Sequence, residues 1–278
     1  MKKINVEVAE YLEYCEKIRG MSKSTMSMKQ NILGRFLKNI NVENVGAISN
    51  RDFNGWVKSE MARGITMQSM NMYNSVIVAM IRYFQDTGMR TSLNLGLIRK
   101  MKGMGSKRIF YTASEIFQVV EKTEIETGLM IMVMFETGMR IAELTRLKTS
   151  EIRGRRIDFV GKGMRMREVY MSVVTARKMF DFLDGREGYV WGFDSLNGEP
   201  PTVNTVRQRM STAFLEAGFE GFYPHALRHS FATALQKKGA SVDEIKEMMG
   251  HSSIATTERY LHGFEGRMEE LFDKYQVG

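Results

Sequence analysis

Cysteine, histidine, proline and tryptophan are scarce in this 278-residue sequence, with 1, 4, 3 and 2 residues respectively. The single cysteine, Cys15, cannot form an internal disulfide, which is typical of a reducing compartment, so we expect a cytoplasmic protein. One cysteine and four histidines leave few ligands, so we expect no metal site. No apolar run approaches the ~20 residues that span a bilayer, and Glu7 interrupts the N-terminus before a signal-peptide core develops, so we expect neither membrane segment nor secretion signal.

What the sequence does contain is an excess of positive charge. The net charge is +8 and the pI is about 9.5. Residues 1–105 hold 16 Lys and Arg against 8 Asp and Glu, whereas residues 106–278 hold 24 of each. Basic proteins attract polyanions, of which nucleic acid is the commonest, but a well-solvated basic surface gives the same composition. Charge alone therefore leaves both interpretations open.

The apolar pattern predicts two domains of mainly α-helical structure. Residues 1–102 have apolar positions at helical spacing and no long alternation, which indicates a small basic helical bundle. Residues 103–111 combine glycines with basic residues and are typical of a linker, so we expect a second domain at 112–278. The two strongest helical stripes consist of Met28, Ile32, Leu33, Phe36, Leu37 and Ile40, and of Met70, Tyr73, Ile77, Met80, Ile81 and Phe84.

The second domain has clear local signals of its own. Thr112-Ala113-Ser114-Glu115 matches a capping box that starts a helix, and an apolar helix over 129–136 is expected to stop at Thr137-Gly138. Residues 156–160 and 167–171 alternate around a glycine-flanked tip, which predicts a β-hairpin. The pattern then returns to helix. The expected fold class is therefore mainly α with a small β-sheet in the second domain.

Four segments of this domain carry residues suited to chemistry at a phosphodiester. The first is Thr137-Gly138-Met139-Arg140-Ile141-Ala142-Glu143-Leu144, in which Arg140 begins a helix and Glu143 lies one turn away to orient it. The planar fork of an arginine can hold two phosphate oxygens. Taken alone, this fragment fits a surface Arg–Glu pair better.

The second segment is the hairpin tip and the third is a helix rich in histidine. Lys162 at the tip can donate a proton to a leaving oxygen, although most lysines in such turns are merely solvated. His225 and Arg228, three residues apart, share one helix face. His229 lies four residues after His225, which makes a metal site an alternative, but a zinc-protease motif needs Glu where Ala226 stands.

The fourth segment contains Gly250-His251-Ser252-Ser253 and, nine residues after the histidine, Tyr260. Gly250 is expected to end the helix over 242–249 and to expose His251 at a turn. A tyrosine hydroxyl is a possible nucleophile, but a lone tyrosine is more often packed in a core with its hydroxyl at the edge. The motif becomes informative only together with the other three.

The four segments, in this order and at this spacing, resemble the tyrosine recombinase (phage integrase) family. That family combines Arg in Thr-Gly-x-Arg-x-x-Glu-Leu, Lys in a Gly-Lys-Gly hairpin, His-x-Leu-Arg-His, and Gly-His followed nine residues later by Tyr. The corresponding residues here are Arg140, Lys162, His225, Arg228, His251 and Tyr260. The resemblance covers nearly the whole second domain and, more loosely, the helical first domain, which would correspond to the core-binding domain.

The resemblance implies a mechanism that needs neither cofactor nor ATP. Tyr260 would attack the scissile phosphate and form a 3′-phosphotyrosine. The two arginines and His251 would hold the charged oxygens, Lys162 would protonate the leaving 5′ oxygen, and His225 would act as the base. Glu143 would orient its neighbours. One ester replaces another, so bond energy is conserved.

The resemblance also implies double-stranded DNA as the partner, held in a two-domain clamp, and four protomers on two DNA sites. Plausible DNA contacts are Lys23, Lys29, Lys107, Arg108, Arg165, Arg207 and Arg209. The C-terminal segment has an apolar face at helical spacing from Phe264 to Tyr275. Such a helix either folds back on its own domain or, as is usual in the family, docks on a neighbouring protomer.

Several functions remain open within and outside this family. The compact length favours a Xer-type resolvase of chromosome dimers, with an archaeal source as one option, and a small phage or plasmid integrase fits nearly as well. A type IB topoisomerase shares the chemistry but not the Gly-His and Tyr spacing. A protein that binds DNA without catalysis is a further alternative, although none of the six catalytic positions departs from the family pattern.

Overall fold

A computed structural model describes residues 3–102, 109–161, 165–192, 199–249 and 267–275 of the chain. The chain divides into two compact units, Met1–Ser106 and Lys107–Gly278, called unit 1 and unit 2 below. The division falls inside the segment expected to be a linker. Each unit has its own hydrophobic cluster.

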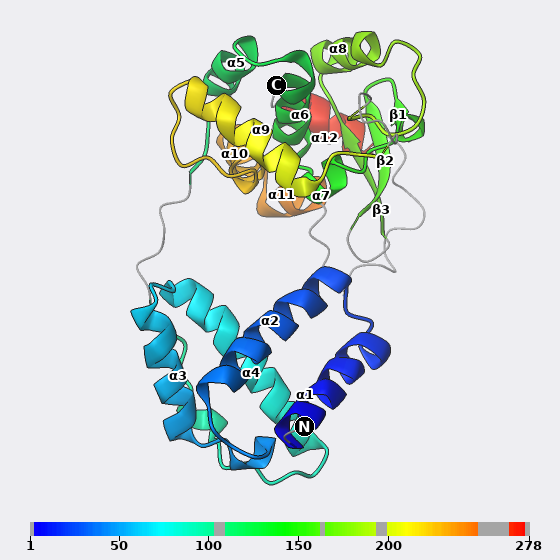
Figure 1. The fold of residues 1–278 in the computed structure, drawn as a ribbon. Helices are drawn as coiled ribbons and strands as arrows, with labels where there is room; N and C mark the ends of the chain where they lie inside the picture. The colour runs from blue at the N-terminus through cyan, green and yellow to red at the C-terminus, as the bar shows by residue number, and fades with distance from the viewer. Residues whose placement is uncertain (1–2, 103–108, 162–164, 193–198, 250–266, 276–278) are drawn as a thin grey trace. The chain divides into compact units, whose positions relative to one another are not determined.

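The regular secondary structure in the described part of unit 1 consists of helices joined by loops, as Figure 1 shows. Three of its α-helices begin at side chains that accept from backbone N–H groups of the first turn: Ser22 from Thr25, Thr66 from Ser69, and Ser49 in a complete capping box with Asp52. The elements are α1 (Lys3–Glu13), a π-helical turn η1 (Tyr14–Ile18), α2 (Lys23–Asn39), a 3₁₀ turn η2 (Val45–Ala47), α3 (Asn50–Ala62), α4 (Met67–Asp86) and a 3₁₀ turn η3 (Leu95–Leu97).

The expected apolar stripes form the core of unit 1. The completely buried side chains include Met70, Ile77 and Met80 on α4 and Leu33 and Phe36 on α2. The Phe36 ring packs edge-on against Trp56 of α3, with 5.1 Å between ring centroids. Met28, Leu37 and Tyr73 pack at the margin of this cluster. The prediction of a helical bundle is therefore confirmed.

Unit 2 combines helices with one small sheet, and both of its predicted boundary signals are confirmed. Thr112 and Glu115 form the capping box that starts α5. Helix α6 begins earlier than expected, at Ile125, and ends where predicted, at Gly138, whose φ is 63°. The helices are α5 (Ala113–Glu121), α6 (Ile125–Thr137), α7 (Ile141–Leu144), α8 (Val173–Leu183), α9 (Val203–Glu216), α10 (His225–Lys237), α11 (Val242–Met248) and α12 (Arg267–Tyr275).

The sheet of unit 2 is antiparallel with the strand order β1-β2-β3. The predicted hairpin is confirmed as β2 (Arg156–Gly161) and β3 (Arg165–Tyr170), which pair from Arg156↔Tyr170 to Gly161↔Arg165. The short β1 (Ile152–Arg153) was not predicted, because two residues carry no periodicity.

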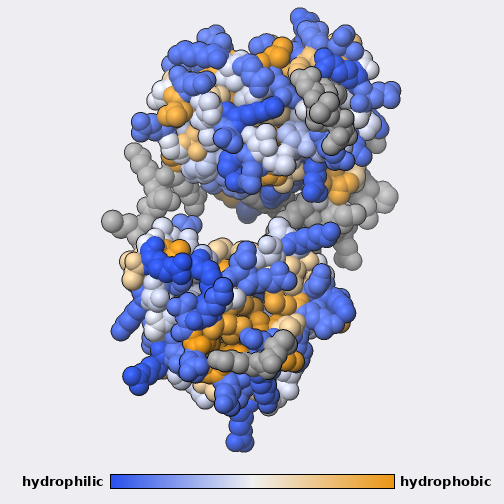
Figure 2. All heavy atoms as spheres, in the orientation of Figure 1, coloured by the Kyte–Doolittle hydropathy of each residue, from blue (hydrophilic) through white to orange (hydrophobic). Residues whose placement is uncertain are grey.

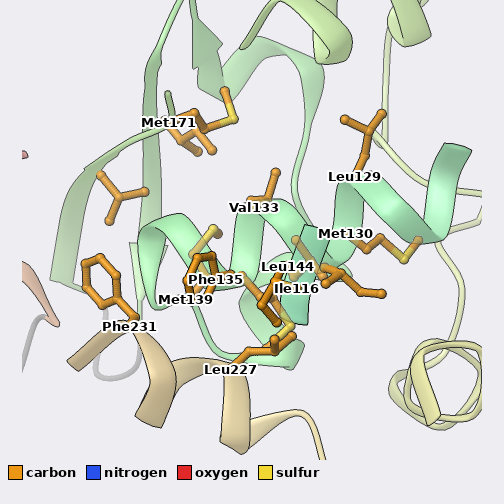
Figure 3. Packing of buried hydrophobic residues seen from close by; sticks show 14 of the residues in the cluster. Ile116, Leu129, Met130, Val133, Phe135, Met139, Leu144, Met171, Leu227 and Phe231 are labelled. Carbon is orange, nitrogen blue, oxygen red and sulfur yellow. The ribbon is translucent and has the colours of Figure 1, made fainter. Parts of the chain in front are cut away.

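Helix α6 is the centre of unit 2. It is apolar on every face, and all its side chains from Leu129 to Phe135 are buried, as expected of a helix surrounded by other elements. Figure 3 shows Leu227 and Phe231 of α10 directed towards α6 and Met139. Many of the chain's methionines, including Met130 and Met134, fill this core, where an unbranched side chain adapts to irregular gaps.

The surface of unit 1 is not uniformly polar. On the face shown in Figure 2, hydrophobic surface is bordered by hydrophilic residues. Large apolar side chains of unit 1 with high exposure include Val6, Ile18 and Leu97. No helix within the described ranges is both long and apolar enough to cross a membrane.

Candidate active site

The turn between α6 and α7 presents Arg140. Gly138 adopts the left-handed conformation, which glycine tolerates best, and its N–H donates to the Met134 carbonyl at 3.0 Å to close α6. Arg140 is then the N-cap residue of α7, and Glu143 reaches back to it. The Arg140 backbone N–H donates to Oε2 of Glu143 at 2.8 Å, and Nη1 of Arg140 donates to Oε1 at 2.8 Å. Glu143 therefore contacts both the backbone and the side chain of Arg140.

Helix α10 brings Arg228 to the same turn. Arg228 is 3% exposed, and its guanidinium donates to two main-chain carbonyls, that of Gly138 and that of Met249, the latter at 2.7 Å. Burial lowers the pKa of Arg228 to about 10, and the positive charges of Arg140 and Arg167 contribute. The guanidinium stays charged at neutral pH. The Arg228 guanidinium thus contacts the backbone of Gly138, which lies 90 positions earlier in the sequence.

His225 lies one helical turn before Arg228 and is exposed to solvent. Partial desolvation of the ring is the largest cause that lowers its pKa below 6.5, followed by the charges of Arg228, His229 and Arg140. The Glu143 carboxylate acts in the opposite direction. His225 is therefore neutral at pH 7 and able to accept a proton.

His229, the residue behind the alternative metal hypothesis, packs its ring edge-on against that of His225, with 6.0 Å between the centroids. Within the described ranges, no group of three or more His, Cys, Asp or Glu side chains is arranged to hold a metal ion.

Three of the six predicted catalytic residues, Lys162, His251 and Tyr260, lie outside the described residues. The elements next to two of them are described. Gly161 and Arg165 are the last paired residues of the hairpin on either side of Lys162. Met249, two positions before His251, is held at its carbonyl by Arg228.

Sequence reasoning missed one charged residue near the site, Arg167 of β3. Its side chain is only 9% exposed, and Nη1 donates to Oε2 of Glu143 at 3.1 Å. Its guanidinium lies over the Phe159 ring, 5.1 Å from the centroid. The alternation of strand side chains could have indicated that Arg167 is buried, because Arg167 shares a strand face with Val169, which is 3% exposed.

The residues expected to contact DNA have different surroundings. Lys23 is exposed on α2 and Arg207 is exposed on α9, whereas Arg209, also exposed, forms an ion pair with Glu126 at 2.5 Å. The expectation that Lys29 contacts DNA is wrong, because its side chain is buried. Lys29 is 6% exposed, and its Nζ donates to the Tyr11 hydroxyl at 2.8 Å inside unit 1. The residues Lys107 and Arg108 and the side chain of Arg165 lie outside the described part of the chain.

Helix α12 packs on its own unit 2 in this single chain. Its residues Leu271, Phe272 and Tyr275 are buried, and Phe272 meets Tyr170 of β3 with 6.2 Å between ring centroids. The Tyr275 hydroxyl donates to Oε1 of Glu244 on α11 at 3.1 Å.

Charged residues border this packing. Arg155 pairs with Asp273 and, at 3.8 Å, with Glu269. The backbone N–H and the hydroxyl of Ser241, then Lys274 and Tyr275, lower the pKa of Glu244 to about 2, so its carboxylate is charged at neutral pH. The first of the two expected arrangements of the tail, in which it folds back on its own domain, is the one observed.

Comparison with known proteins identifies one family, and it finds relatives that align with nearly the whole chain. The model of the phage integrase family matches residues 107–267, more than half of the chain. A tyrosine recombinase from Thermosipho africanus is 24% identical over 279 residues, covering 95% of this chain and 96% of the relative. Tyrosine recombinase XerA from Pyrococcus furiosus is 26% identical over 284 residues, covering 96% and 92%.

Solved structures show the same fold at low identity. A lambda integrase (75–356) dimer bound to a COC′ core site matches with a TM-score of 0.71 at 18% identity, covering 88% of this chain and 95% of that one. The XerH recombinase bound to a palindromic difH substrate in a post-cleavage complex matches with a TM-score of 0.70 at 20% identity, covering 92% and 81%.

Proposed function

The chain belongs to the phage integrase family, and from this premise we propose that it cuts and rejoins DNA through a covalent phosphotyrosine on Tyr260. It is a site-specific DNA recombinase of the Xer type, a DNA-binding and self-associating enzyme. The observation that carries the mechanistic proposal is the position of Arg228. Its guanidinium donates to the carbonyls of Gly138 and Met249, and these residues lie two positions before Arg140 and His251 respectively.

The first half of the proposed reaction forms the protein–DNA bond. The Tyr260 hydroxyl attacks the scissile phosphorus, and neutral His225 takes the hydroxyl proton. Arg140 and Arg228 hold the non-bridging oxygens as negative charge develops, with His251 as a further donor. Removing one such donor costs about 3–4 kcal/mol of barrier in comparable electrostatic catalysis.

The second half of the step breaks the DNA backbone. The bond from phosphorus to the 5′ oxygen breaks, and Lys162 gives that oxygen a proton, which leaves a 5′ hydroxyl and a 3′-phosphotyrosine. Attack by the 5′ hydroxyl of another strand reverses the chemistry and regenerates Tyr260. The number of phosphoester bonds is unchanged, so the step requires no external energy source.

Both units take part in DNA binding in this proposal. The proposed phosphate contacts are Lys23, Arg207, Arg209, Lys107, Arg108 and Arg165. Lys29 is not among them, because it is buried. Phosphate contacts make binding strongly dependent on salt, because they release condensed counterions. We place the protein in the cytoplasm, where chromosomal DNA is accessible.

The biological role we propose is resolution of chromosome dimers by four protomers on two DNA sites. On assembly, α12 of one protomer would leave its own unit and dock on a neighbour, as the alternative arrangement of the tail requires. A role in phage or plasmid integration uses the same chemistry on two different sites. Recombination between two copies of one chromosomal site supports the first role, and a requirement for two dissimilar sites supports the second.

The test of the proposed chemistry uses DNA sites selected by binding to the protein and nicked beside each candidate cleavage position. The nick lets a short strand diffuse away and traps the covalent complex. A slower band on a denaturing gel, absent with Tyr260→Phe and present with Tyr275→Phe, is the expected result. Binding without any trapped band would support the alternative of a non-catalytic DNA-binding protein.

A further inference from the structure

The carboxylate of Glu143 is shared by two arginines. Its Oε1 accepts from Nη1 of Arg140 at 2.8 Å, and its Oε2 accepts from the Arg140 backbone N–H at 2.8 Å and from Nη1 of Arg167 at 3.1 Å. The Glu143 side chain is only 8% exposed. One nearly buried carboxylate thus fixes a residue of the α6–α7 turn and a residue of β3 together.

This arrangement is unfavourable for Arg167 taken by itself. Burial lowers the pKa of Arg167, and the nearby charge of Arg140 lowers it further, whereas Glu143 partly compensates. Nη2 of Arg167 is buried and has no hydrogen-bond partner among the described residues. A buried guanidinium with an unsatisfied donor costs stability, and an apolar side chain that packs on Phe159 would avoid that cost. The position of Arg167 therefore suggests a role in function.

The hairpin connects Arg167 to the proposed general acid. In the β2–β3 register, Arg167 lies opposite Phe159, and the last pair before Lys162 is Gly161↔Arg165. Arg167 is thus two residues, roughly 7 Å of strand, from the end of the pairing that carries Lys162. A contact so near the tip limits how far the hairpin can bend away from the arginines.

We propose that Arg167 is a positioning residue, which sets the hairpin of Lys162 relative to Arg140 through their common partner Glu143. The group that protonates the leaving oxygen and the group that holds the phosphate would then be aligned by a single carboxylate. This inference rests on the proposed function, in which Lys162 is the acid. It assigns Arg167 no contact with DNA.

The test compares two DNA substrates that differ in one atom. In the first, the leaving group is the ordinary 5′ oxygen, and in the second that bridging oxygen is replaced by sulfur. A thiolate leaves without protonation, so the sulfur substrate does not need the acid. The Lys162→Ala variant should cleave the oxygen substrate slowly, and its cleavage rate should be restored on the sulfur substrate. The Arg140→Ala variant should cleave both substrates slowly.

If Arg167 positions the acid, Arg167→Met should behave like Lys162→Ala. We expect cleavage of the oxygen substrate to fall about 10- to 100-fold, the range for a displaced catalytic group, and cleavage of the sulfur substrate to change less than about threefold. The control is Arg156→Met on the same hairpin. Arg156 pairs with Asp158 on the opposite face, so both rates should stay unchanged.

The ratio of the two rates separates positioning from loss of folded protein, because partial unfolding lowers both rates equally. An unchanged ratio in Arg167→Met, or in Arg167→Lys if the methionine variant does not fold, would overturn the inference. Lack of sulfur rescue in Lys162→Ala would instead contradict the acid assigned in the proposed function. The two failures are therefore distinguishable.

Discussion

Arg228 donates a hydrogen bond from Nη2 to the carbonyl oxygen of Met249 at 2.7 Å. The same guanidinium donates to the carbonyl of Gly138. A residue proposed to bind phosphate therefore also cross-links α10, the α6–α7 turn and the end of α11. Chemistry and local stability are coupled at this residue, so stability must be measured alongside activity in any variant of the site.

Gly138 should tolerate no side chain. Its φ of 63° disfavours other residues, and a Cβ there would lie 2.6 Å from Cδ1 of Phe231. Gly154 has nearly the same φ, 62°, and its Cβ position is open. We expect Gly154→Ala to cost about 1–2 kcal/mol and Gly138→Ala about 2–5 kcal/mol, because only the latter adds a steric clash.

Urea unfolding measures this difference through the fluorescence of Trp191, which lies in unit 2 and donates to the Leu144 carbonyl, in a Trp56→Phe background. Equal destabilisation by the two alanines would show that Phe231 does not restrict the Gly138 turn.

His225 should set the acid limb of the pH profile. Desolvation and nearby positive charge lower its pKa below 6.5, so the neutral base is lost only as the pH falls through a value under 6.5. At DNA concentrations below saturation, the cleavage rate should rise with pH through that pKa and become level above it. His225→Gln should be slow and lack this limb, and His229→Gln should keep it. A limb retained in His225→Gln would exclude His225 as the base.

Tail exchange can be tested by mixing two charge-swapped proteins. Arg155→Asp and Asp273→Arg each replace the attraction of the Arg155–Asp273 pair with repulsion, which should weaken docking of α12 and lower strand exchange several-fold. In the mixture, the tail of the Asp273→Arg protein finds an opposite charge only on a neighbouring protomer that carries Arg155→Asp. Higher activity of the mixture than of either variant supports exchange, and simple averaging supports a tail that stays on its own unit.

Two lysines of α2 should differ in their effect on DNA binding. Lys23→Ala removes an exposed charge and should weaken binding to all sequences, with a slope of log affinity against log salt reduced by about one. Lys29→Ala removes a buried side chain that donates to Tyr11, and should lower the free energy of unfolding while it leaves the salt slope unchanged. A reduced slope for Lys29→Ala would contradict its placement in the core.

The sequence predicted best what local chemistry controls. The Thr112 capping box, the stop at Gly138 and the β-hairpin each depend on a few adjacent residues, and each is confirmed. The burial of Lys29 and of Arg167 depends on partners 18 and 24 positions away in sequence, and local patterns do not specify such distant partners.

The candidate site was predicted through the family pattern rather than through geometry. Helical spacing pairs Arg140 with Glu143 and His225 with Arg228, but only the structure shows that the two pairs come together. The convergence depends on α6 as a buried scaffold, with α7 and α10 packed against it. Tertiary packing of this kind is invisible to helical periodicity, which fixes only the inward face of each helix.

The most direct test of the account is to identify the amino acid that bears the DNA. The trapped complex would be digested with nuclease and protease, and the peptide that gains a nucleotide mass would be sequenced by mass spectrometry. We predict a 3′-phosphodiester on Tyr260, with the adduct yield reduced by about 10²–10³ in Arg228→Ala. A nucleotide on another of the ten tyrosines, or on a serine, would contradict the assignment on which the mechanism depends.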